Sequence, residues 1–136
     1  MHRVALALAL LIVTACTAPD AGAPSTGASP SPTACADVTD AAAERAPDGT
    51  WRFDVTVSSA DSGWDKYADA WEVRLPDGTV VGTRELTHPH VDEQPFTRSL
   101  GGVEVPDGTD SVTVAARDSV SGYCGVTFDV DLVPGR

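Results

Sequence analysis

The stretches Trp51-Arg-Phe-Asp-Val-Thr-Val57 and Val126-Thr-Phe-Asp-Val-Asp-Leu132 alternate apolar and polar residues almost without a break. Successive side chains of an extended chain point to opposite faces, so each stretch buries one face and leaves the other in water. This pattern predicts two half-buried β-strands. Four further strands are predicted from less regular alternation: Trp71–Leu75, Thr79–Leu86, Phe96–Val105 and Val112–Ala116.

The tripeptide Pro-Asp-Gly occurs at 47–49, 76–78 and 106–108, and Thr follows it each time. Pro fixes the φ of a turn position, the Asp side chain caps the turn, and Gly adopts a positive φ. The first two copies each lie directly between candidate strands. They therefore predict β-hairpins.

The segment Cys35–Arg45 contains the run Asp40-Ala-Ala-Ala-Glu-Arg45, whose residues favour a helix by intrinsic propensity. It leads straight into the first turn and a clean strand, so we expect a first strand here, with a helix as the alternative. The fold class that follows is all-β: a single antiparallel β-sandwich, immunoglobulin-like, with about seven strands.

The N-terminal residues predict export. A basic start, Met1-His2-Arg3, precedes the apolar run Val4–Val13, which is shorter than the roughly 20 residues that span a bilayer. The next residues, Val13-Thr-Ala-Cys16, resemble the lipobox of bacterial lipoproteins. That resemblance implies a signal peptide over 1–15 and acyl chains, palmitate among them, on Cys16. They would hold the protein on the extracytoplasmic side of the cell membrane. The alternative is an ordinary signal peptide.

Composition divides the rest of the chain into a tether and one domain. Residues 16–34 are rich in Pro, Ala, Ser, Thr and Gly and hold no aliphatic side chain larger than Ala, so we expect a disordered tether. Residues 35–136 form the expected domain. The formal net charge of −11, with a single Lys, excludes nucleic acid as a partner. We expect a monomer that stands off anionic headgroups.

Two cysteines remain if Cys16 is lipidated, namely Cys35 and Cys124. The exported compartment permits a disulfide between them. The first opens the first predicted strand and the second precedes the last, so the bond forms easily if those strands lie side by side and parallel. The alternative is two free thiols, and the spacing matches no zinc motif.

Three segments depart from simple alternation: residues 59–70, 86–100 and 118–125. They resemble a family of uncharacterised exported bacterial proteins that carry Tyr-Ala-Asp-x-Trp, His-x-His-Val-x-Glu-Gln-Pro-Phe-x-Arg and Gly-Tyr-x-Gly elements. The matching elements here begin at Tyr67, His88 and Gly122. Cys124 stands where a small residue is expected, which fits an added disulfide. The resemblance groups the chain with these proteins and implies no activity.

His88 and His90 are the two histidines of the chain beyond its signal peptide. Residues i and i+2 of an extended segment point to the same side, so both imidazoles, with Glu93 or Asp92 nearby, could ligate Cu²⁺ or Zn²⁺. The alternative is that Pro89 fixes an extended loop in which the imidazoles bond locally. No other cofactor is predicted.

Aromatic and acidic residues of the same segments are further candidates. Trp64, Tyr67 and Tyr123 could form an exposed patch that contacts a sugar or a peptide, or a small core that pins the loops. Three aspartates of the first segment could offer oxygens to Ca²⁺, although they lack EF-hand spacing: Asp61, Asp65 and Asp69.

Enzymatic motifs are weak in this sequence. It has neither a Gly-x-Ser-x-Gly element nor a Gly-rich phosphate loop, so no enzyme is predicted. The expected function is a lipid-anchored extracytoplasmic binding or structural module for an unknown protein or small-molecule partner. The alternative is a transition-metal-binding lipoprotein that uses His88 and His90.

Overall fold

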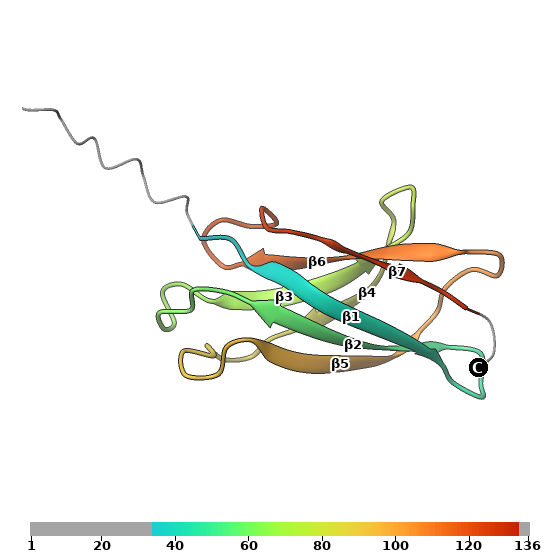
Figure 1. Ribbon diagram of the computed structural model, residues 1–136, viewed down its shortest axis with the longest axis horizontal. Coiled ribbons are helices and arrows are strands. Elements are labelled where there is room, and N and C mark those ends of the chain that lie inside the picture. The colour runs from blue at the N-terminus through green and yellow to red at the C-terminus, as the bar shows by residue number, and fades with distance from the viewer. Residues whose placement is uncertain (1–33, 134–136) are drawn as a thin grey trace, which may run out of the picture.

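The computed structural model describes residues 34–133, which form two antiparallel sheets packed face to face (Figure 1). One sheet has the order β1-β2-β5, with β1 at Asp37–Arg45, β2 at Trp51–Ser58 and β5 at Phe96–Val103. The other has the order β4-β3-β6-β7, with β3 at Ala68–Arg74, β4 at Val80–Glu85, β6 at Ser111–Asp118 and β7 at Phe128–Asp131. The predicted seven-stranded β-sandwich is confirmed.

The core lies between the two sheets, and the alternate apolar residues of β2 point into it. Trp51, Phe53, Val55 and Val57 are all buried, and the residues between them are exposed or half-buried. From the opposite sheet, Trp71 on β3 is fully buried. Each such large apolar side chain stabilises the fold by about 1.5–3 kcal/mol relative to an exposed one. In residues 34–133 no helix is long and apolar enough to cross a membrane.

Strand β1 contains the alanine-rich run that propensity alone would make helical. Ala41 faces Val55 of β2 across the ladder, and Ala43 faces Phe53. Pairing with a neighbouring strand therefore overrides the weak helical preference, which amounts to only a few tenths of a kcal/mol per residue. The preferred prediction, a first strand over Cys35–Arg45, is confirmed except at its first two residues.

The Pro-Asp-Gly turns close as their chemistry predicts. Gly49 and Gly78 each have a φ of 89°, a left-handed conformation that glycine adopts without strain. They lie in the turns of the β1–β2 and β3–β4 hairpins. In each turn the Asp side chain accepts a hydrogen bond from the backbone N–H two residues further along the chain. The third turn, with a φ of 85° at Gly108, joins β5 to β6 and so crosses between the sheets.

The last strand is shorter than its alternation predicts. Val126, predicted to be buried, is 64% exposed, and the ladder with β6 involves only Phe128–Asp131. Val126 instead exchanges hydrogen bonds with the start of β1, accepting from the N–H of Val38 and donating to the side chain of Asp37, at 2.9 and 2.7 Å. The chain thus crosses from one sheet to the other before β7 begins.

Two long loops meet at one end of the sandwich, on the left in Figure 1, where the described chain also begins. The first connects β2 to β3 and the second connects β4 to β5. The first carries Trp64 and Tyr67, and the second carries His88, His90 and Glu93. The C-terminal side of β5 and its turn lie at the opposite end.

Candidate functional site

The two long loops border an open hollow of about 530 Å³. This volume falls within the range of small-molecule sites, about 300–1,000 Å³. Its lining comes from the tip of the β2–β3 loop and from one run of the β4–β5 loop: Gly63, Trp64, His88, Pro89, His90, Val91, Asp92 and Glu93. The hollow therefore joins two of the three segments that depart from strand alternation.

A tight turn presents Trp64 at this hollow. The backbone N–H of Lys66 donates to the carbonyl oxygen of Gly63, and that of Ser62 donates to the carbonyl of Lys66. The indole ring is 69% exposed and meets the ring of Tyr67 edge-on, with centroids 5.7 Å apart. Trp64 and Tyr67 are thus in contact, and hydrogen bonds hold the backbone of the turn that carries the exposed ring.

His88 and His90 lie together but in different environments. Their ring centroids are 4.5 Å apart, yet His88 is exposed whereas His90 is only 3% exposed and stacks on Phe96 at 3.8 Å. Neither ring nitrogen of His90 has a hydrogen-bond partner in the described part of the chain. Burial, with the charges of Arg98 and His88, lowers the pKa of His90. The imidazole is therefore neutral at pH 7.

Asp61 fixes the two loops to each other. Its side chain is fully buried and accepts hydrogen bonds from the backbone N–H of Ala68, from the backbone N–H of His90 and from the hydroxyl of Ser59. Gln94 adds a second link, because its amide accepts from the N–H of Ser59 and donates to the carbonyl of His90. This buried network sets the shape of the hollow.

The carboxylate predicted to join the two imidazoles has another partner. Glu93 accepts two hydrogen bonds from Arg98, at 3.2 and 3.0 Å, and this hydrogen bonding holds the pKa of Glu93 below its usual value. Among residues 34–133, no three His, Cys, Asp or Glu side chains are grouped so as to hold a metal ion. A site of His88, His90 and Glu93 is thus not assembled in this conformation.

The other candidates separate in the fold. Tyr123 lies by β3, away from Trp64, and its hydroxyl donates to Glu72 at 2.7 Å while Arg74 covers its ring at 4.7 Å. Burial and this hydrogen bond raise the pKa of Tyr123 to about 12. Of the three aspartates considered for Ca²⁺, Asp61 serves the loop network and Asp69 accepts two hydrogen bonds from Arg117.

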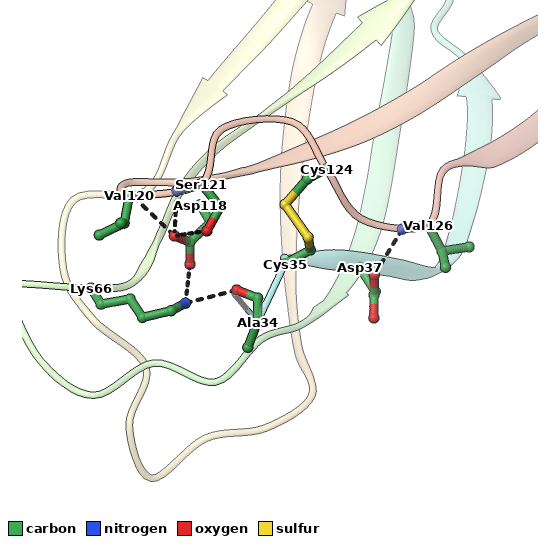
Figure 2. The surroundings of a disulfide bond; sticks show 9 residues. All are labelled: Ala34, Cys35, Asp37, Lys66, Asp118, Val120, Ser121, Cys124 and Val126. Atoms are coloured by element: carbon green, nitrogen blue, oxygen red, sulfur yellow. Dashed lines mark hydrogen bonds and ion pairs between the residues drawn. A yellow bond between two sulfur atoms is a disulfide. The ribbon is translucent and has the colours of Figure 1, made fainter. Parts of the chain in front are cut away.

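Cys35 and Cys124 form a disulfide with their Cα atoms 5.4 Å apart (Figure 2). It joins the residues before β1 to the β6–β7 connection. Gly125 follows directly, and a Cβ there would lie 2.0 Å from the carbonyl oxygen of Ala36, so only glycine fits this crossing. The last glycine of the Gly-Tyr-x-Gly element is therefore structural. Cys16 lies outside the described residues.

A buried ion pair beside the disulfide was not predicted. The ammonium group of Lys66 contacts the fully buried carboxylate of Asp118 and donates to the carbonyl of Ala34 at 2.8 Å (Figure 2). Burial opposes ionisation of Asp118, but Lys66 and the backbone N–H groups of Val120 and Ser121 together lower its pKa. The sequence signal for this ion pair was Lys66, because it is the single Lys of the chain.

The chain is similar to a protein of Halomicrobium mukohataei named "Putative lipoprotein", with 41% identity over 100 residues. The alignment covers 74% of this chain and 49% of that relative. The chain therefore spans about half the length of the relative. No protein-family model and no solved structure matches the chain.

Proposed function

We propose that this protein is a lipid-anchored, extracytoplasmic and non-catalytic binding module that takes its ligand in the hollow between the β2–β3 and β4–β5 loops. One observation carries the proposal: the exposed ring of Trp64 stands on a hydrogen-bonded turn at the edge of an open hollow of ligand size. An ordered aromatic ring presents a large contact area at little cost in conformational entropy.

Two observations support the anchor. The residues Val13–Cys16 resemble a lipobox, and the chain is similar to a protein whose name describes a lipoprotein. Cys16→Ser removes the acylated atom, so we expect the variant to move from the detergent phase to the aqueous phase in a detergent-partitioning assay of expressing cells. Partitioning that is unchanged from the wild type would refute the lipobox interpretation.

The hollow is tested with Trp64→Ala. We expect at least one compound from a library of sugars, organic cations, carboxylates and dipeptides to bind the full chain in ligand-observed NMR, and to lose about tenfold or more in affinity to the variant, as at an aromatic hot spot. Val80→Ala removes another exposed apolar side chain and serves as the control. Absence of Trp64-dependent binding across the library contradicts the proposal.

Transition-metal binding is the second candidate function. It is favoured by the contact between the rings of His88 and His90 and by the two ring nitrogens of His90, which make no hydrogen bond among the described residues. Calorimetric titration of the metal-free protein with Cu²⁺ and Zn²⁺ is expected to give heats of binding that disappear in His88→Ala/His90→Ala. The heats should also weaken as the pH falls through about 6.5, because free imidazole becomes protonated there. Equal heats in both proteins exclude this function.

A further inference from the structure

The charges around the hollow leave it acidic. Its lining includes Asp92 and Glu93 but neither Lys nor Arg. The nearest cations are occupied, because Lys66 of the Trp64 turn contacts Asp118 and Arg98 pairs with Glu93. In the part of the chain that the structure describes, Asp92 takes part in no ion pair. A charged ligand that fits this hollow is a cation.

The aromatic surface favours the same class of ligand. A cation over the face of a Trp ring is attracted by the quadrupole of the ring, and weakly hydrated quaternary ammonium groups are the ligands that exploit this attraction most. The ring of Trp64 is the exposed indole of the described chain, since Trp51 and Trp71 are buried in the core. The chain as a whole carries a net charge of −11, which attracts cations over a longer range.

His90 supplies an independent indication of a ligand. It lines the hollow and is only 3% exposed, and among the described residues neither ring nitrogen makes a hydrogen bond, although Nδ1 lies 3.9 Å from a carboxylate oxygen of Asp61. Buried polar groups are almost always hydrogen-bonded, so this imidazole keeps capacity for a further hydrogen bond, which a ligand meets only if the side chains covering the ring nitrogens move aside. A neutral imidazole offers one donor and one acceptor, and either can serve a hydroxyl group.

We propose that the hollow binds a small organic cation with a methylated ammonium group and a nearby hydroxyl, the ammonium packed against Trp64 and balanced by Asp92. This inference rests on the proposed function and specifies the class of ligand for the same site. Because Asp92 is exposed to solvent, its attraction for the cation is screened by salt.

Choline is the probe, and its neutral analogue with carbon in place of the quaternary nitrogen is the matched ligand control. We titrate the full chain in detergent and follow tryptophan fluorescence, to which the exposed Trp64 responds. The neutral analogue loses the attraction to the Trp64 ring and the attraction to Asp92, so its binding is expected to be weaker by about fivefold or more. Rising ionic strength should weaken choline binding and leave the analogue unaffected.

Two variants measure separately what Asp92 and Trp64 contribute to choline binding. Asp92→Asn is expected to weaken choline binding about two- to fivefold, and Trp64→Leu about fivefold or more, as measured by calorimetry because the fluorescent ring is lost. The control is Asp107→Asn, an exposed carboxylate in the turn at the other end of the sandwich, which should bind as the wild type does.

Three outcomes overturn the inference. Equal affinity for choline and its neutral analogue shows that charge is not recognised. Binding that is unchanged in both Asp92→Asn and Trp64→Leu places the ligand elsewhere. The third outcome is that the wild type fails to bind choline while a sugar or a dipeptide binds in a Trp64-dependent way. That result supports the proposed function but excludes a cation as the ligand.

Discussion

Replacement of Cys124 by alanine is expected to lower the free energy of unfolding by about 2–5 kcal/mol, the range for native disulfides. The bond closes a loop across a sequence separation of 89, so it removes many conformations from the unfolded chain. It also joins the residues before β1, in one sheet, to the connection between β6 and β7 of the other sheet. Urea denaturation followed by tryptophan fluorescence measures the loss.

The matched variants are Cys35→Ala and the double variant Cys35→Ala/Cys124→Ala. Each removes the same bond, so all three are expected to lose the same free energy within about 0.5 kcal/mol. Alkylation of unreduced protein in a Cys16→Ser background gives a direct check. Two reactive thiols there would show that the bond does not form in the exported chain.

Asp61→Ala is expected to have the second largest effect, a loss of about 2–4 kcal/mol. The substitution leaves three donors without their acceptor, on Ser59, Ala68 and His90, and each unsatisfied buried group costs about 1–3 kcal/mol before local rearrangement. The β2–β3 and β4–β5 loops should also separate. Amide hydrogen exchange at Ala68 and His90 is therefore expected to accelerate together.

Asp65→Ala is the control, since it removes an exposed carboxylate of the same charge from the same loop. Its effect on stability should stay within about 0.5 kcal/mol. A loss in Asp61→Ala no larger than in Asp65→Ala would mean that the buried network contributes nothing. Asp61→Asn, which keeps one acceptor oxygen and the side-chain shape, should fall between the two.

The strands could be predicted from sequence because their burial repeats every two residues. The faces of β2 follow that rule at each position from Trp51 to Val57. The rule fails at Val126, where the chain has left its own sheet to bond with β1. No local pattern records a contact with a residue nearly ninety positions away, so the length of β7 could not be predicted.

The site was predicted only in part. Sequence spacing placed His88 and His90 on one side, and their rings do meet. It could not show that Phe96 covers one ring and leaves the other exposed, because that difference depends on how the loop folds over β5. Tyr123 fell outside the site for a similar reason, since its partners Glu72 and Arg74 lie on β3.

The disulfide also determines how the domain bears mechanical load. Tension applied to the chain ahead of the domain enters at Ala34 and Cys35, beside the edge strand β1. Without the bond, that tension would act directly on the hydrogen bonds between β1 and β2. The covalent link passes it to Cys124 and the β6–β7 connection, and the Lys66 contacts with Ala34 and Asp118 hold the same point from a third loop. A pulled domain therefore resists as two sheets at once.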